Sequence, residues 1–496
     1  MRGERADGEP VQGSAAACVN CHRRSGLGTT GGRIVIPAIT GKYLFQPGAR
    51  PMPESGAAAL AVASARDRYT DATLARAISK GIGPDGHELS YLMPRFKLDA
   101  ASMGTLIDYL RGLSTGPVPG VSGDTLHFAT VITPDADPTR RQGMLAVLRA
   151  FFASKNEFFR GDAPALYAQR KIMFRVVRKW QLHVWELTGP ADTWDPQLQE
   201  KLRAEPVFAL VSGLAGADWT PVHRFCQREA IPCLLPNVDV PVVDENAFYP
   251  VYFSKGVLLE AQLVAQQLTA SAVRPQIKRL IQVFRTGDAG EAAAQALRDA
   301  LPAGAPETES RAVNGASGRQ GLTEALRGIT EHDVLMLWLR PDDLQGLPSE
   351  PPTARLVFVS GLMGQLENAP LLPAWRRVAQ MAYPFDLPEL RRVRMNYPLG
   401  WFAIRHIPLV AERTQVDTYL ACVILAEALG HMRDDFVRDY LVEQLETMVS
   451  FRLINGYYPR LGLAPGQRFA SKGGYIVHFA DPQGNRIIAD GDWIAP

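Results

Sequence analysis

The stretch Cys18-Val19-Asn20-Cys21-His22 decides the fold and chemistry of the first part of the chain. Two cysteines three positions apart, followed directly by a histidine, form the pattern at which haem c is attached covalently. Each thiol adds to one vinyl group of the haem, and the imidazole becomes an axial ligand of the iron. A redox CxxC pair or half of a zinc site is the alternative, but zinc needs two more ligands at short spacing. Since the sequence has no second CxxC and no HxxxH, it predicts one covalently bound haem c.

The second axial ligand is predicted at Met93, in the segment YLMPRF at residues 91–96. Glycines and prolines interrupt residues 81–94, which predicts a loop. A helix is expected to follow, with Asp99 as its cap and apolar residues at helical spacing. Methionine also serves as a core filler. His87 is a rival ligand, but it follows a Pro-Asp-Gly turn that is typical of solvated surface. We therefore expect His/Met ligation of the iron.

A haem ligated by His22 and Met93 has both axial positions filled. Methionine ligation raises the iron potential, and no substrate can reach the metal, so the haem is expected to transfer single electrons. Basic residues flank both ligand motifs and predict a rim that steers an acidic redox partner. These residues are Arg23, Arg24, Arg95 and Lys97.

Residues 14–114 resemble a class I cytochrome c domain. The resemblance rests on the CxxCH motif in a first helix, the Ile-Pro-Ala segment at 36–38, a middle helix at 71–80, the Met-Pro-Arg-Phe loop and a last helix. It implies an all-α fold in which the carbonyl group of Pro37 accepts a hydrogen bond from the His22 ring. It also implies that the haem pocket is lined by Pro37, Pro94 and Arg95.

Composition fits a soluble protein, and the predicted haem implies export. The chain has 496 residues and a formal net charge of +2, and its length predicts about three domain-sized units. It has no basic tract for nucleic acid and no run of eighteen apolar residues to span a membrane. The start, MRGERAD, lacks the apolar region of a signal peptide. Because haem c is attached after export, we expect a mature or recombinant form, or a misplaced start, of a periplasmic bacterial protein.

The rest of the chain has a different organisation. Residues 1–13 are predicted to be an N-terminal tail, and residues 115–123, rich in Gly, Pro and Ser, a linker. From 124 to 496 apolar strands alternate with helices, which predicts parallel sheets covered on both faces. Ligands bind such sheets outside the carboxyl ends of the strands. There is no GxGxxG after the first strand, no P-loop and no GxSxG, and we do not expect an enzyme.

Residues 124–496 resemble the periplasmic type I substrate-binding proteins, the class of the Leu/Ile/Val-binding proteins. The stretches that carry the resemblance are Val211–Ala217, Arg228–Asn237, Tyr249–Ser254, the Ala-rich helix Tyr419–Leu429 and the closing strand Gly474–Phe479. The resemblance implies two lobes that are hinged by three crossings and close on a small molecule. Lobe 1 is expected at about 124–250 and 384–455, and lobe 2 at about 251–383 and 456–496.

The same resemblance implies a ligand site, although the sequence departs from the family there. The loop that holds a ligand carboxylate in the family would be Ser212, Gly213, Leu214 and Ala215, with Asn237, Tyr252 and Phe253 nearby. Amino-acid binders have Ser and Thr in this loop and an acid after a strand of the second lobe, whereas here the loop is Gly-Leu-Ala-Gly-Ala and 359–364 hold no acid. A buried ammonium group without a carboxylate is costly, so an α-amino acid is disfavoured. A more apolar or aromatic cleft is suggested by Trp219, Tyr252, Phe253, Trp338 and Met363, with core packing as the alternative for each aromatic residue. Leu362 is a further candidate ligand residue.

Three cysteines lie outside the haem motif. An oxidising compartment would permit a disulfide between Cys226 and Cys233, although helix-to-strand geometry can hold their Cα atoms too far apart. Cys422 is expected to be buried and inert. His223 with Cys226 lacks a third orienting group, and the pair Asp342-Asp343 is expected to cap a helix.

Two functions remain open, and the sequence favours the first, because a redox haem has no obvious use in plain uptake and the amino-acid signature is missing. The first is a periplasmic mono-haem c-type cytochrome that transfers single electrons. Its second domain would dock or sense a partner dehydrogenase, or the substrate or cofactor of that dehydrogenase; another cytochrome is the other expected redox partner. The second is a solute-binding protein of an ABC-type importer for a small non-standard organic ligand, with an accessory haem. Tight solute binding in both haem redox states would favour the importer, and fast, salt-sensitive reduction by a dehydrogenase would favour electron transfer.

Overall fold

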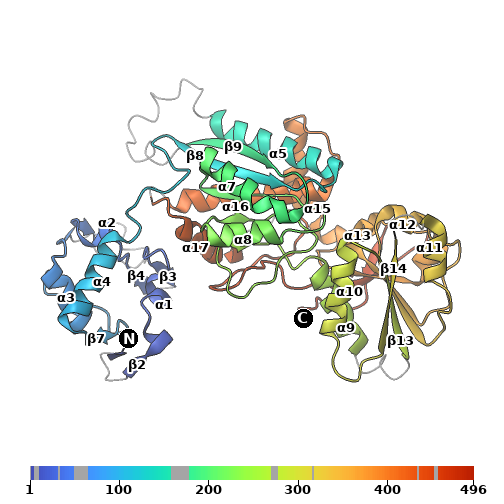
Figure 1. Ribbon diagram of the computed structural model, residues 1–496, viewed down its shortest axis with the longest axis horizontal. Helices are drawn as coiled ribbons and strands as arrows, with labels where there is room; N and C mark the ends of the chain where they lie inside the picture. The colour runs from blue at the N-terminus through green and yellow to red at the C-terminus, as the bar shows by residue number, and fades with distance from the viewer. Residues whose placement is uncertain are drawn as a thin grey trace. The chain divides into compact units, whose positions relative to one another are not determined.

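The computed structural model describes residues 2–4, 10–31, 34–49, 65–157, 178–269, 277–314, 318–432, 435–451 and 456–496. The chain forms two compact units (Figure 1). Unit 1 comprises Met1–Pro119 and Asp434–Glu443, and unit 2 comprises Gly120–Arg433 and Gln444–Pro496. The boundary between the units therefore falls inside the predicted linker, and a short segment from the C-terminal part of the chain belongs to unit 1.

In its described residues, unit 1 contains the three predicted helices and a further helix at residues 41–44 that was not predicted. They are α1 (Val19–His22), α2 (Gly41–Leu44), α3 (Asp71–Lys80) and α4 (Ala100–Gly112), with a 3-10 turn at Gly13–Ala16. Asp99 caps α4, its side chain accepting from the amide of Ser102 at 2.8 Å, as predicted. The helices α3 and α4 bury apolar side chains in one small core, among them Leu74, Ile78, Ile107 and Leu110.

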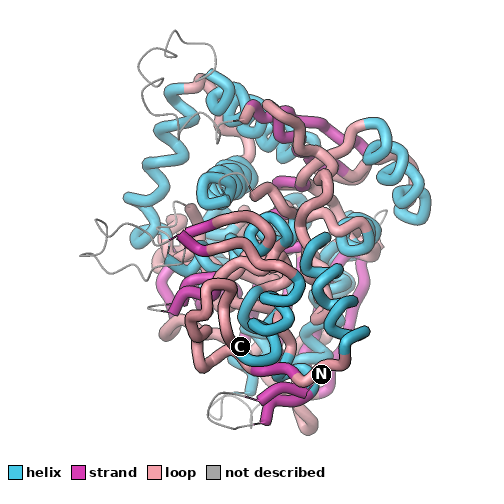
Figure 2. The backbone as a smooth tube through the Cα atoms, turned by 90° about the vertical axis from the view of Figure 1, so that its left-hand side faces the viewer, coloured by secondary structure: helices cyan, strands magenta, loops and turns pink. Residues whose placement is uncertain are grey.

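The all-α prediction for this unit is incomplete. A three-stranded antiparallel sheet is formed by the strands β1 (Arg2–Glu4), β2 (Pro10–Gln12) and β7 (Arg95–Phe96), and it is visible near the N-terminus in Figure 2. Two further antiparallel pairs join β3 (Thr29–Gly31) to β4 (Ile34–Ile36) and β5 (Gly48–Ala49) to β6 (Ala65–Arg66). The predicted tail at 1–13 thus includes two paired strands, while residues 1 and 5–9 lie outside the described residues. Strands of two or three residues are too short to show an alternating pattern.

Lobe 1 of unit 2 is built on a five-stranded parallel sheet in the order β12-β11-β10-β8-β9. The strands are β8 (Thr125–Ile132), β9 (Lys179–Glu186), β10 (Ala209–Val211), β11 (Cys233–Leu234) and β12 (Pro250–Val251). Its helices are α5 (Pro138–Glu157), α7 (Trp194–Ala204), α8 (Thr220–Arg228), α15 (Pro388–Ile404) and α16 (Glu412–Met432). α16 packs on α5, so the chain returns to this lobe after it has formed the second one.

Lobe 2 is built on a seven-stranded sheet in the order β14-β13-β15-β16-β17-β18-β19, in which only the last two strands are antiparallel to their neighbours. The strands are β13 (Arg279–Arg285), β14 (Glu307–Val313), β15 (Asp333–Trp338), β16 (Leu356–Ser360), β17 (Ala379–Tyr383), β18 (Tyr475–Phe479) and β19 (Ile487–Ala489). The helices of lobe 2 are α9 (Val257–Thr269), α10 (Ala289–Ala300), α11 (Gly318–Ala325), α12 (Pro341–Gln345), α13 (Gly361–Gly364) and α14 (Pro373–Val378). A further helix, α17 (Arg438–Met448), precedes the last crossing and is not part of this lobe; its residues up to Glu443 belong to unit 1. In Figure 1, α9 and α10 lie on one side of the sheet and α11 and α12 on the other.

The two-lobed α/β architecture predicted for the larger part of the chain is confirmed. The chain passes between the sheets after β12, after β17 and before β18, which gives the three expected crossings. β15 is buried along its whole length, as expected for a strand inside a parallel sheet with both faces covered. In the part of the chain that the structure describes, no helix is long and apolar enough to cross a bilayer.

Candidate functional site

Charged side chains from both lobes of unit 2 meet at the carboxyl ends of the two sheets. Asp239 follows β11, Asp288 follows β13, and Arg340 follows β15. Arg140 lies in the first turn of α5, the helix after β8, and α16 supplies further charged residues near its start. We call this group the interlobe cluster; its members are Arg140, Asp239, Asp288, Arg340, Arg413 and Asp417. The position is the one where open α/β sheets bind ligands.

Arg340 joins the two lobes within this cluster. Its guanidinium donates two hydrogen bonds to the carboxylate of Asp288 in lobe 2, at 2.9 and 2.8 Å. A third hydrogen bond, of 2.9 Å, reaches Asp239 in lobe 1. Two-pronged arginine–carboxylate pairs are among the stronger polar contacts in proteins, so Arg340 is a charged link across the lobe boundary.

The other two arginines are less well paired. Arg140 donates to Asp239 at 3.3 Å and to the hydroxyl of Thr414 at 3.2 Å, while its Nη2 has no hydrogen-bond partner among the described residues. Arg413 lies 3.6 Å from Asp239 and 3.7 Å from Asp417, which is beyond hydrogen-bond distance. The oxygen atoms Asp239 Oδ1 and Asp417 Oδ1 are also buried, and neither has a hydrogen-bond partner in the described part of the chain.

The protonation of the buried carboxyl groups reflects this arrangement. Burial opposes ionisation of Asp239, but Arg140, Arg340 and Arg413 outweigh it and hold its pKa well below the ordinary value. Burial raises the pKa of Asp417 to about 7, against the pull of Arg413 and Arg140. The cluster therefore contains one carboxylate that is firmly ionised and one carboxyl group that titrates near neutrality.

Aromatic rings adjoin Arg413. Phe253 stacks on Tyr458, with ring centroids 5.2 Å apart, and Phe385 contacts the same ring at 5.3 Å. The guanidinium carbon of Arg413 lies 6.0 Å from the centre of the Phe385 ring. Phe253 is the predicted ligand residue that the structure brings beside the cluster.

The loop predicted to hold a ligand carboxylate is engaged by the chain itself. The carboxylate of Asp135 accepts hydrogen bonds from the amides of Gly216 at 3.4 Å and Ala217 at 2.8 Å, and from the hydroxyl of Thr133. These bonds outweigh the effect of burial and lower the pKa of Asp135. The amide of Leu214 donates to Val131 as the sheet continues. The amide of Leu214 is therefore used by the sheet, and the amides of Gly216 and Ala217, at the end of the same loop, are used by an internal carboxylate.

Most other predicted ligand residues are internal. The Ser212 hydroxyl donates to Thr418 at 2.8 Å, and the Asn237 amide donates to Ser212 at 2.9 Å, forming a buried network. Trp219 and Tyr252 lie in the core of lobe 1, whereas Trp338, in lobe 2, donates to Gln282 at 2.9 Å. Leu362 is buried, and its amide donates to Glu260. Core packing, the alternative for the aromatic residues, corrects the expectation of an aromatic cleft built from Trp219, Tyr252 and Trp338.

The remaining candidates are also structural. Cys226 and Cys233 are buried thiols and are not joined in the disulfide that was considered, and burial raises the pKa of Cys422. The His223 ring contacts the Tyr252 hydroxyl at 2.8 Å. Asp343 is held by Arg285, at 2.8 and 2.5 Å.

In unit 1, the haem motif forms a single helical turn. Cys18 caps α1, and its carbonyl group accepts from the amides of Cys21 at 3.2 Å and His22 at 2.8 Å. The His22 ring nitrogen Nδ1 lies 2.8 Å from the carbonyl oxygen of Pro37. A carbonyl only accepts, so Nδ1 carries the proton and Nε2 is the nitrogen able to bind a metal. Burial lowers the pKa of His22, which favours the neutral imidazole that ligation needs.

The Met93 loop is held by arginine side chains. Arg95 donates to the carbonyl groups of Met93 and, at 3.3 Å, Leu89, and Pro94 is half-buried between Met93 and Arg95. Arg76 donates to the carbonyl group of Gly83 at 2.7 Å. Unit 1 thus contains two thiols on one turn, an imidazole oriented by a carbonyl group and a thioether on a braced loop, which are the types of group that could hold a haem c.

His87 and the predicted basic rim have other contacts. The His87 ring pairs with the carboxylate of Asp85. Arg24 forms an ion pair of 2.9 Å with Asp439 of the same unit, while Arg95 serves the Met93 loop. The charge of Arg24 is therefore paired within the unit, whereas Arg95, among the described residues, donates only to neutral carbonyl groups and keeps its charge. Arg23 and Lys97 also have interactions with other residues.

A carboxylate of α17 completes the turn after the haem motif. Glu443 accepts from the amide of Ser25 at 2.9 Å and from its hydroxyl at 2.5 Å, and both residues are buried. The carbonyl group of Ser25 accepts from the hydroxyl of Ser114 at 2.7 Å. The segment Asp434–Glu443 thus fixes the backbone three residues after His22.

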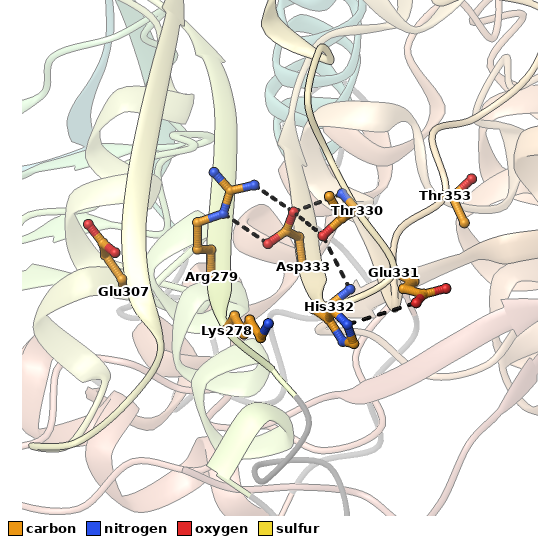
Figure 3. A pocket seen from close by; sticks show the side chains of 8 residues that line it. All are labelled: Lys278, Arg279, Glu307, Thr330, Glu331, His332, Asp333 and Thr353. Carbon is orange, nitrogen blue, oxygen red and sulfur yellow. Dashed lines mark hydrogen bonds and ion pairs between the residues drawn. The ribbon is translucent and has the colours of Figure 1, made fainter.

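A cavity of about 780 Å³ lies at the opposite, amino ends of the lobe 2 strands (Figure 3). It is lined by Lys278, Arg279, Glu307, Thr330, Glu331, His332, Asp333 and Thr353. Arg279 and Asp333 bind each other at 3.0 and 2.7 Å (Figure 3). Because its strongest charges are paired and it lies away from the carboxyl ends, this cavity is a weaker candidate than the interlobe cluster.

Two solved structures show the same fold as this chain. A fatty acid ABC transporter substrate-binding protein from Thermomonospora curvata matches with a TM-score of 0.52 and 13% identity, over 77% of this chain and 95% of that one. A substrate-binding periplasmic protein from Ralstonia solanacearum matches with a TM-score of 0.50 and 14% identity, over 73% of this chain and 99% of that one. No family model and no curated protein matches the sequence.

At these identities the likeness shows the fold, which is that of the periplasmic type I substrate-binding proteins. Nearly the whole of each neighbour is matched, so neither contains a counterpart of the rest of this chain. The cytochrome c resemblance therefore stays a prediction that rests on the residues of unit 1.

Proposed function

We propose that unit 2 binds a small solute between its lobes, as the solute-binding protein of an ABC-type importer does. The observation that carries the proposal is Arg340, whose guanidinium links Asp239 of lobe 1 to Asp288 of lobe 2 at the carboxyl ends of both sheets. Charges are costly to bury, and apolar residues would hold two lobes together at least as well. A polar solute that enters there would contact both lobes. The neighbours of the same fold carry names of substrate-binding proteins, which supports a binding role without catalysis.

The test is thermal unfolding of the full chain across a library of small solutes. A ligand that binds only the folded state raises the unfolding temperature by mass action. A solute of unit 2 should stabilise the parent, and the size of that effect should change clearly in D239N, in both haem redox states. The matched control is D192N, an exposed aspartate in the same lobe. Equal stabilisation of the parent and D239N by every active solute would contradict this site.

We further propose that unit 1 carries one haem c, attached through Cys18 and Cys21 and ligated by His22 and Met93. The bond between the His22 ring and the Pro37 carbonyl group supports it, because this contact leaves Nε2 as the metal-binding nitrogen. A haem with both axial positions filled supplies single-electron transfer. The redox partner is then a periplasmic dehydrogenase or another cytochrome. The compartment in which the protein acts is the periplasm.

The haem proposal is tested by absorbance spectra of protein expressed in a periplasm. Covalent low-spin haem with the weak near-infrared sulfur-to-iron band is expected. M93A should lose the band and bind carbon monoxide, whereas H87A should keep the parent spectrum. Loss of the band in H87A together with its retention in M93A would contradict the assignment of Met93.

A further inference from the structure

We infer that the solute of unit 2 is an organic monoanion, a carboxylate, whose charge is held by Arg140 and Arg413. The inference rests on the proposed solute-binding function and names the chemical class that the interlobe cluster selects.

The first step is the charge of the cluster. Arg340 is compensated by the two-pronged contact with Asp288. Arg140 and Arg413 share the carboxylate of Asp239, which also accepts the third hydrogen bond of Arg340. Arginine does not lose its proton in proteins, so one positive charge lacks a counter-ion whenever Asp417 is protonated.

Two buried acids of these surroundings, Asp417 and Glu260, are shifted toward their neutral forms. Burial raises the pKa of Asp417 to about 7 and that of nearby Glu260 to about 8. Burial lowers the pKa of Arg140, and the neighbouring Arg413 and Arg340 add to this effect, which is the result expected for an under-compensated cation.

The second step is the geometry. Arg140 Nη2 is buried without a hydrogen-bond partner among the described residues, and Arg413 has its nearest acids at 3.6 and 3.7 Å. Both guanidinium groups therefore have N–H donors that are available for hydrogen bonds. A carboxylate readily accepts two hydrogen bonds from guanidinium groups. One such group would satisfy both the charge and the donors.

The third step excludes the other anion site of this fold. The amides of Gly216 and Ala217 already donate to Asp135, and a Cβ on Gly216 would lie 2.5 Å from that side chain. A solute carboxylate would have to displace an internal one there, with no gain in charge compensation. The stacked rings of Phe253 and Tyr458 beside Arg413 instead suit the apolar body of an organic acid.

The experiment titrates the full chain by calorimetry with matched acid and amide probes, benzoate against benzamide and hexanoate against hexanamide, at pH 6 and low salt. The acid of at least one pair should bind tenfold or more tightly than its amide. R140Q and R413Q should abolish the difference, while R327Q, at an exposed arginine of lobe 2, should preserve it. Equal binding of acid and amide overturns the inference and leaves the proposed function standing; binding of neither member of either pair also overturns it, and the solute library then decides the proposed function.

A second readout needs no ligand. Without solute, R140Q should unfold at the parent's temperature or above, since it removes an uncompensated buried charge. D239N should unfold at a clearly lower temperature, because it leaves more uncompensated charge. Destabilisation of R140Q as large as that of D239N would show that Arg140 is already compensated, and would overturn the inference.

Discussion

Asp417 and Glu260 are buried acids whose pKa values lie above their ordinary range, at about 7 and about 8 against 3.8 and 4.5. Burial is the main cause for both. The folded state therefore holds protons that the unfolded chain releases. The stability that these groups contribute is complete below about pH 4 and is lost as the pH rises through 7 and 8.

We predict that the free energy of unfolding falls between pH 4 and pH 8, at up to about 1.4 kcal/mol per pH unit for each carboxyl group. The double variant D417N/E260Q imitates the protonated forms and should flatten this dependence. Urea unfolding at a series of pH values measures it, with E200Q, an exposed glutamate of α7, as the control. An equally steep fall in the double variant would show that other groups titrate.

Gly28 lies where the backbone after the haem motif meets the Pro37 segment. Its φ is +75°, and an added Cβ would stand 2.1 Å from the carbonyl oxygen of Ile36. Gly86 is the matched control, since its φ is +86° and nothing lies within 4 Å of such a Cβ. Replacing either glycine by alanine strains the backbone, but only the substitution at Gly28 also pushes the Pro37 segment away from His22.

We predict that G86A costs about 1–2 kcal/mol, the strain of a left-handed residue, and that G28A costs clearly more and lowers the haem content. Chemical unfolding and the ratio of haem to protein absorbance measure the two effects. Equal losses of stability and of haem content in G28A and G86A would mean that the Pro37 segment can move without affecting either property.

At the scale of elements, α17 supplies Glu443 to the turn after the haem motif. E443Q turns one accepting oxygen into a donor, so that either the Ser25 amide or its hydroxyl loses its acceptor. We predict a loss of about 1–3 kcal/mol, the cost of leaving a buried polar group unsatisfied, measured by chemical unfolding. E200Q should have no effect, and an E443Q variant as stable as the parent would show that water replaces these bonds.

The elements that the sequence predicts well are those with a local signal. The helix at 71–80 and the Asp99 cap are determined by residues close to them in sequence. The strand β15 is recognised because it is an almost continuous run of apolar residues. β14 carries no such local signal, because this edge strand has a largely polar sequence, ETESRAV. Short pairs such as β1 with β7 depend on partners far along the chain.

The interlobe cluster has no local signal at all. Arg140, Asp239, Arg340 and Arg413 come from separate elements of both lobes, and each looks like an ordinary surface charge in sequence. Only the topology of the two sheets brings them together. The CxxCH motif is the opposite case, because all its chemistry lies in five consecutive residues.

At the scale of the whole molecule, the two candidate sites belong to different units. The haem ligands lie in unit 1, and every member of the interlobe cluster lies in unit 2. We predict that C18S/C21S removes the haem and leaves the affinity of unit 2 for its solute unchanged within about twofold, about 0.4 kcal/mol. Calorimetry on the parent and the double variant tests this, and a large loss of affinity would show that the haem unit takes part in solute binding.

The most direct test of the account is amide hydrogen exchange of the full chain with and without the most stabilising solute. The interlobe cluster predicts new protection at the carboxyl ends of the strands, in residues 133–142, 236–241, 286–290, 339–343 and 412–418. Protection instead around the cavity of Lys278, Arg279 and Asp333, or confined to unit 1, would contradict it.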